Sequence, residues 1–228
     1  MTEHAKKPRM TRKSLRRPDE FHHVAGEAVG WAEKHQRTLI TAGVTAVVIA
    51  LIVLAFGRLQ ATRDDAAAAA FQSGHAAFDA GRYPDAATAF AALAQDYGRT
   101  PFGRLANLYR GHALVRSKDL PGAVAAYQEF IAAGAPAEYL RQEALNGLGH
   151  AQEASGAASA ALSAYAEAGA IKGPYRIDSL LGAARLQEAS GQATAAQDIY
   201  RTLLGEAPDA EMQAFLRSKL PPPEAPQS

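Results

Sequence analysis

Three histidines and an arginine recur at nearly equal intervals in the sequence after residue 60. They are His75, His112, His150 and Arg185, each 35 to 38 residues after the one before. Imidazole and guanidinium groups can hydrogen-bond to a peptide, and imidazole can also exchange protons or bind a metal. The regular interval suggests that one structural unit repeats. The four side chains, which we call the polar ladder, would then lie on one surface.

A shared metal site or a catalytic site is not what this spacing predicts. Packed helices lie about 8–10 Å apart, whereas zinc ligands stand about 2.0–2.1 Å from the metal. The sequence has no cysteine, no HExxH motif and no glycine-rich phosphate loop. The adjacent pair His22–His23 is better interpreted as solvated. We therefore predict no enzymatic activity, no metal and no cofactor.

Two interpretations of the polar ladder stay open. In the first, a row of titratable groups binds an acidic or extended peptide, more strongly below about pH 6.5. In the second, histidine merely occupies a half-exposed position. Asn146 lies one helical turn before His150 and should share its exposure, so it joins the ladder among the candidate groove residues.

The chain around these residues repeats itself four times. Ala151–Tyr165 and Leu186–Tyr200 are identical at nine of fifteen positions, and Phe78–Phe90 and Val115–Tyr127 are more diverged copies. A period near 34 residues is typical of a helix–turn–helix solenoid. Each copy ends on an aromatic residue that should fill the gap to the next unit: Phe90, Tyr127, Tyr165 and Tyr200.

Small residues indicate how each unit folds. Gly81, Gly156 and Gly191 fall at the turn between two helices, where a left-handed backbone favours glycine, and Lys118 takes this place in the second unit. Other small residues should let the two helices approach closely: Ala86, Ala123, Ala161 and Ala196 in the second helices, and Gly74, Gly111, Gly149 and Ala184 in the first. The junctions between units carry Pro101, Pro136, Pro174 and Pro208.

These positions resemble those of the tetratricopeptide-repeat family over roughly residues 65–209, although the family's early Trp is absent from all four units. The resemblance implies an all-α solenoid of about four repeats, with a concave groove lined by the first helices that holds proteins or peptides. Residues from Asp209 to Leu220 should form a capping helix. We assign 65–220 to the repeat domain and the proline-rich 221–228 to a disordered tail.

An apolar stretch precedes the repeats. Residues 38–57 carry no charge and are bracketed by Arg37 and Arg58. As a helix they would span roughly 30 Å, the thickness of a bilayer's hydrocarbon core. A buried core helix normally keeps a polar stripe, and a cleaved signal peptide has a shorter apolar core with a cleavage site close behind. We therefore predict one uncleaved transmembrane helix in contact with lipid.

The positive charges indicate the orientation of this helix. Nine Lys and Arg residues precede it, whereas only Arg58 and Arg63 fall in the first twenty residues after it. Because Lys and Arg mark the cytoplasmic side, residues 1–37 should be a basic cytoplasmic tail, with an amphipathic helix over 19–37. In a bacterium the repeats would be periplasmic and the span would lie in the inner membrane. No nucleic-acid partner is expected, because the basic segment has no recognition motif.

A second resemblance is more specific. The basic tail, single span and repeat domain, together with Thr100–Phe130, are similar to the ancillary subunits of the bacterial Sec translocon. This implies the Sec channel and membrane-anchored periplasmic folding factors as partners. The function it implies is a scaffold or chaperone-like adaptor for exported proteins. The alternative is a scaffold or assembly factor of another envelope complex, in outer-membrane protein assembly, cytochrome maturation or cell division.

Overall fold

The computed structural model describes residues 31, 33–207 and 209–222, and within these ranges all regular structure is helical. Contacts divide the chain into two compact units, Met1–Leu59 and Gln60–Ser228, which are treated separately below. The all-α class predicted from the repeats is confirmed. The predicted amphipathic helix falls mostly on residues outside the described ranges, as do most of the 221–228 tail and Pro208.

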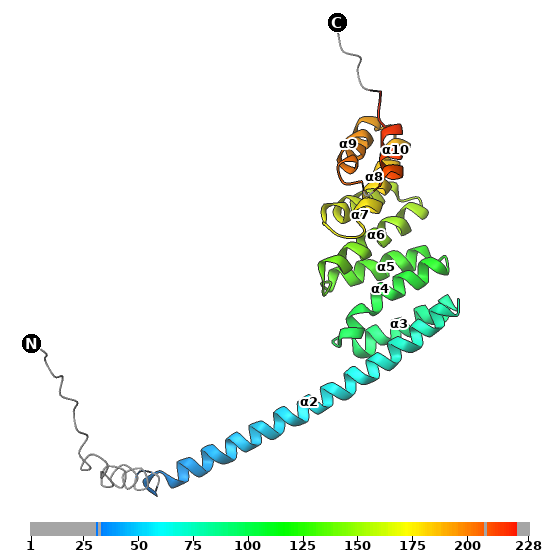
Figure 1. The fold of residues 1–228 in the computed structure, drawn as a ribbon. Helices are drawn as coiled ribbons and strands as arrows, with labels where there is room; N and C mark the ends of the chain where they lie inside the picture. The colour runs from blue at the N-terminus through cyan, green and yellow to red at the C-terminus, as the bar shows by residue number, and fades with distance from the viewer. Residues whose placement is uncertain (1–30, 32, 208, 223–228) are drawn as a thin grey trace, which may run out of the picture. The chain divides into compact units, whose positions relative to one another are not determined.

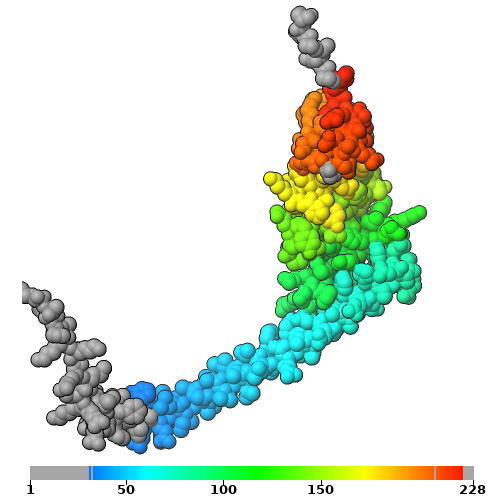
Figure 2. All heavy atoms as spheres, in the orientation of Figure 1, coloured from blue at the N-terminus to red at the C-terminus, as the bar shows by residue number. Residues whose placement is uncertain are grey.

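The first unit contains the start of helix α2 (Gln36–Asp79). An 18-residue window of α2 has a mean hydropathy of 2.8, and none of that window is buried. Phe56, for example, is 67% exposed. Figure 2 shows the side chains of this stretch arranged along a single helix. The helix is long and apolar enough to cross a membrane, whereas a core helix of a soluble domain would be mostly buried.

The second unit is a row of helical hairpins closed by one further helix (Figure 1). Each hairpin pairs a first helix with a second helix, and residues 60–79 of α2 serve as the first helix of the first hairpin. The other elements are α3 (Tyr83–Tyr97), α4 (Pro101–Arg116), α5 (Leu120–Ala132), α6 (Glu138–Ala154), α7 (Ala158–Ala170), α8 (Arg176–Ala189), α9 (Ala193–Leu204) and α10 (Ala210–Ser218). Because α10 packs on α9, it closes the end of the core as the predicted capping helix.

The turns inside the hairpins share one backbone geometry. The φ angles at the turn glycines are +74° at Gly81, +81° at Gly156 and +78° at Gly191. Lys118 takes the same left-handed conformation with φ of +66°, although L side chains rarely adopt it. The second unit therefore makes the same turn as the others, as the register of the repeats predicts.

Two of the buried aromatic rings, those of Tyr127 and Tyr165, each lie between two glycines. A Cβ atom added to Gly149 of α6 would lie 2.6 Å from the ring of Tyr165, and one added to Gly182 of α8 would lie 2.8 Å from it. The ring of Tyr127 is enclosed in the same way by glycines of α4 and α6. The aromatic residue thus joins its own first helix to that of the next unit, which confirms its predicted role and explains why glycine recurs there.

The first helices form one continuous surface. In the described part of the chain, α4 contacts α6 and α6 contacts α8, whereas no second helix contacts the second helix of the next unit. The first helices are therefore the more closely spaced layer of the solenoid. We call the side of α4, α6, α8 and residues 60–79 of α2 that faces away from the second helices the inner surface.

Candidate partner-binding surface on the first helices

The polar ladder lies on the first helices, but its members have different surroundings. His75, His150 and Arg185 are exposed, and His112 is partly buried. Asn146 is only 6% exposed, so the prediction that it shares the exposure of His150 is wrong. Asn146 is buried because α8 covers it: its amide donates to Asp178 of α8 and accepts from the Ser179 hydroxyl.

His75 is held by its own helix and by aromatic neighbours. Its Nδ1 lies 3.0 Å from a carboxylate oxygen of Asp79, one turn further along α2. Its ring centroid lies 6.2 Å from those of Phe71 and Tyr109. The imidazole is exposed and already has an acidic partner within the chain.

His112 lies between two tyrosine rings. The ring centroids of Tyr109 and Tyr127 are 5.8 and 5.7 Å from its own. Its Nε2 is 3.5 Å from a carboxylate oxygen of Glu143 on α6. Burial disfavours the charged imidazole and lowers the pKa of His112 to about 4. At this position the expected gain in positive charge below about pH 6.5 does not occur.

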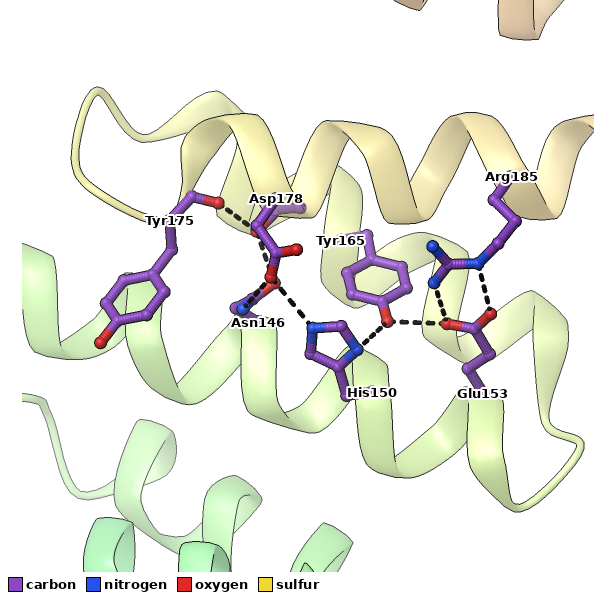
Figure 3. A network of polar contacts seen from close by, with 8 residues as sticks. Asn146, His150, Glu153, Tyr165, Tyr175, Asp178 and Arg185 are labelled. Carbon is purple, nitrogen blue, oxygen red and sulfur yellow. Dashed lines mark hydrogen bonds and ion pairs between the residues drawn. The ribbon is translucent and has the colours of Figure 1, made fainter. Parts of the chain in front are cut away.

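His150 belongs to a hydrogen-bond network that joins α6, α7 and α8 (Figure 3). Its Nε2 lies 3.0 Å from the carboxylate of Asp178 and its Nδ1 lies 2.8 Å from the Tyr165 hydroxyl. That hydroxyl donates to Glu153 at 2.8 Å, and Arg185 donates to both oxygens of Glu153 at 3.0 and 2.7 Å. The network links the third repeat (α6 and α7) to the first helix of the fourth (α8).

The two ring nitrogens of His150 have different partners. A carboxylate only accepts, so Nε2 donates in its contact with Asp178. Nδ1, on the other side of the ring, faces the Tyr165 hydroxyl. The imidazole therefore connects the carboxylate of α8 to the tyrosine of α7.

The pKa values of the neighbouring groups agree with this arrangement. Although burial acts to raise it, the pKa of Asp178 is lowered by the hydrogen bonds from His150 and Asn146. The hydrogen bond from Arg185 holds the pKa of Glu153 below its usual value. Burial, followed by the bond to Glu153, raises the pKa of the Tyr165 hydroxyl.

Every member of the polar ladder therefore has an acidic partner inside the chain. The partners are Asp79, Glu143, Asp178 and Glu153, in the order of the ladder. Side chains that already have a carboxylate neighbour within the chain offer little attraction to an acidic peptide. Among the residues that the structure describes, no group of three or more His, Asp or Glu side chains could hold a metal.

Aromatic side chains occupy the start of the first helices. They are Phe102 of α4, Tyr139 of α6 and Tyr175 at the N-cap of α8, each nine or ten residues before the small residue of its helix. Phe102 and Tyr139 are exposed, and Tyr175 is partly buried. The regular spacing of these aromatic residues is visible in the sequence, but the prediction from the sequence rested on the polar ladder instead. The rings of Phe102 and Phe71 are tilted against each other with 5.1 Å between their centroids, and Tyr139 is 55% exposed.

Comparison with solved structures supports the repeat architecture. The chain is similar to nearly identical TPR-like repeats from Podosopora anserina, with a TM-score of 0.55 and 16% identity over 69% of this chain and 84% of that one. It is also similar to a tetratricopeptide repeat protein from Parabacteroides merdae ATCC 43184, with a TM-score of 0.58 and 14% identity. That match covers 68% of this chain and 59% of the other. At these identities the likeness shows the fold alone.

The sequence comparison assigns the family. No curated protein matches the chain significantly. The profile of the tetratricopeptide repeat-like domain matches residues 30–172, which is more than half of the chain. The match begins before the apolar stretch of α2 and ends before α8, so the fourth hairpin rests on the structure and on the internal repeat. The chain belongs to the tetratricopeptide repeat-like domain family.

Proposed function

We propose that this protein is a membrane-anchored scaffold that holds partner proteins on the inner surface of its repeats. The observation that carries the proposal is the row of aromatic side chains at the start of successive first helices, of which Phe102 and Tyr139 are exposed. Aromatic residues with an apolar body and a polar tip are enriched at protein interfaces. The fold itself supports protein partners in general, because solenoids use their extended inner surfaces for binding.

The anchor in this proposal is the apolar half of α2. Its side chains are exposed in the first unit, where water would solvate them poorly and lipid would solvate them well. The charge asymmetry supports a cytoplasmic N-terminus. The proposed division of the chain is a tail over 1–37, a span over 38–57, an extracytoplasmic repeat domain over 65–220 and a tail over 221–228.

Within this role, an ancillary position at the bacterial Sec translocon is the finer proposal. It is supported by the order of basic tail, span and repeats and by the similarity of Thr100–Phe130. The protein would hold the channel, a folding factor or newly exported chains, and would carry out no reaction of its own. A scaffold of another envelope complex would use the same inner surface for different partners.

In-cell photo-crosslinking tests the scaffold. A benzoylphenylalanine is placed at Tyr139 on the inner surface or at Gln128, an exposed position of the second helix α5. Crosslinked products are solubilised gently and identified by mass spectrometry. We expect specific products from position 139 and few from position 128. Equal or absent crosslinking at the two positions would show that the inner surface is not the binding surface.

The identity of the products tests the finer proposal. Recovery of the translocation channel with newly exported chains would support the translocon role. Recovery of another envelope complex without the channel would favour the alternative and leave the scaffold in place. The topology has its own test, because the natural chain has no cysteine. A membrane-impermeant maleimide should label Ser163→Cys when only the outer membrane is opened, and Ser14→Cys only after lysis.

A further inference from the structure

We propose that the inner surface binds an arginine or lysine side chain of a partner protein, at a subsite formed by Glu143, Tyr109, Tyr139 and Tyr175. This Glu143 subsite deepens the proposed function and rests on it. It reverses the expectation from the polar ladder, which pointed to an acidic peptide. The inference rests on the position of the carboxylate, on its missing cation and on the rings around it.

Glu143 occupies the middle of the inner surface. It lies on α6, where its side chain is 22% exposed, and it faces groups from α4, α5 and α8. The Nε2 of His112 is 3.5 Å away, and the hydroxyl of Tyr175 hydrogen-bonds to the carboxylate. The carboxylate is also close enough to raise the pKa values of Tyr109 and Tyr127, after burial.

Glu143 is a partly buried glutamate of the described repeats without an Arg or Lys partner, whereas the unpaired Glu138 and Glu211 are exposed. Five glutamates of the described repeats pair with an Arg or Lys side chain within 3.3 Å: Glu129, Glu153, Glu167, Glu188 and Glu206. The basic group nearest to Glu143 is His112, which burial keeps neutral near pH 7 because it lowers the pKa of that imidazole to about 4. A charge that lacks a partner in this way is characteristic of a binding site.

The pKa of the Glu143 carboxyl reflects the cost of burying it without a cation. Burial raises the pKa of its carboxyl, since a low-dielectric environment disfavours the ionised form. The Tyr175 hydrogen bond acts in the opposite direction but does not cancel the effect. A guanidinium or ammonium group from a partner would remove this penalty. An acidic side chain would increase it.

The surrounding rings suit the same ligand. The face of an aromatic ring attracts a cation within about 6 Å of its centroid. Tyr139 is more than half exposed, Tyr109 is partly buried, and Figure 3 shows the Tyr175 ring directed away from the His150 network. Next to Tyr109, Phe71 and Phe102 offer an apolar contact, with Phe71 and Tyr109 centroids 4.8 Å apart. We therefore expect a cationic residue beside an apolar one.

Paired peptides test the charge requirement. The full chain is kept in neutral dodecyl maltoside micelles, so that a basic probe finds no anionic lipid. The probes are fluorescein-labelled GSLRFSG and the same peptide with citrulline, the uncharged analogue, in place of arginine. Fluorescence polarisation gives both dissociation constants. We expect the arginine peptide to bind about 10- to 100-fold more tightly, as for a charge-assisted hydrogen bond in a partly buried site.

Variants assign that preference to the subsite. Glu143→Gln should bring the ratio of the two dissociation constants to about one. Glu167→Gln, which makes the same charge change on the second helix α7, should keep the wild-type ratio. Tyr139→Leu should weaken arginine binding about two- to fivefold, the effect of one exposed cation–π contact. Circular dichroism of each variant verifies that the repeats stay folded.

Three results would overturn the inference. They are equal binding of both peptides to the wild type, no binding of either, and an unchanged preference in Glu143→Gln. Any of these leaves the scaffold intact provided that position 139 still crosslinks to partners in the cell. Absence of those crosslinks would contradict the scaffold proposal itself. The scaffold and the Glu143 subsite are therefore tested by different measurements.

Discussion

Replacing Gly149 by alanine should destabilise the repeat domain, although alanine is the better helix former. Helix propensity alone favours the change by about 1 kcal/mol. The new Cβ would, however, lie 2.6 Å from both Cδ1 and Cε1 of Tyr165, a ring that is 0% exposed. The ring cannot retreat toward α8, because a Cβ at Gly182 would already lie 2.8 Å from its Cε2 and Cζ. The ring therefore has helix backbone on both sides.

The expected change in the free energy of unfolding follows from these two opposing effects, helix propensity and overpacking. Overpacking a tight core costs about 1–3 kcal/mol, and a ring enclosed on both sides belongs in the upper half of that range. After the gain in propensity, the free energy of unfolding should fall by about 1–2 kcal/mol. For a domain of this size that corresponds to a decrease in Tm of about 2–8 °C.

Urea unfolding of the full chain in mild detergent, followed by circular dichroism at 222 nm, measures this change. Gly205→Ala is the matched control: its φ of −73° suits alanine, and its nearest neighbour would be 3.6 Å away. The control should unfold at the wild-type urea concentration or slightly above. If Gly149→Ala is as stable as the wild type, or more so, the proposed wedging of Tyr165 between two helices is refuted.

Three further predictions can be checked in the same assay. Lys118→Gly should stabilise by about 1 kcal/mol because φ there is +66°, whereas Gly156→Ala, at +81°, should destabilise by a similar amount; equal signs would contradict the turn geometry. Tyr165→Phe keeps the ring but leaves Glu153 and His150 without the hydroxyl, and should cost about 1 kcal/mol; no loss would exclude the network as a stabilising element. Burial lowers the pKa of His112 from 6.5 to about 4 in the folded chain. As the pH falls, the unfolded chain therefore binds a proton at this imidazole before the folded chain does. The free energy of unfolding should be highest above pH 6.5 and should fall by about 2–3 kcal/mol by pH 4. His112→Gln should flatten that slope. The slope is compared in a Glu143→Gln background, because the raised pKa of that carboxyl gives the opposite slope; identical slopes with and without His112 would disprove its burial as the cause.

The repeat architecture was predictable because its determinants are local. Glycine at the turns and small residues at the helix contacts each act within one hairpin, so their spacing along the chain specifies the fold of one repeat. Lys118 shows how strong this register is: the turn forms in the left-handed conformation without the glycine that usually permits it. The fourth hairpin could be predicted in the same way, from its identity to the third.

The candidate site was less predictable because its determinants are not local. His75, His112 and His150 occupy equivalent positions in successive units, yet their surroundings differ. His75 contacts Asp79 of its own helix, His112 is partly buried between two tyrosines, and His150 is held in a network with the next unit. The differences come from what the next unit places opposite each imidazole. Periodicity cannot supply that information, because it describes what the units share. For the same reason, periodicity gives no indication that Glu143 could be a binding residue.

By itself, the sequence determined that helices form, where they turn, which residues repeat and which stretch is apolar enough for a membrane. These properties depend on backbone preferences and on spacing along the chain. Only the tertiary structure decided that Asn146 is buried under α8, that the polar ladder is matched by carboxylates and that Glu143 lacks a cation. Those facts depend on side chains some thirty residues apart, because burial and charge pairing arise only when neighbouring repeats pack together.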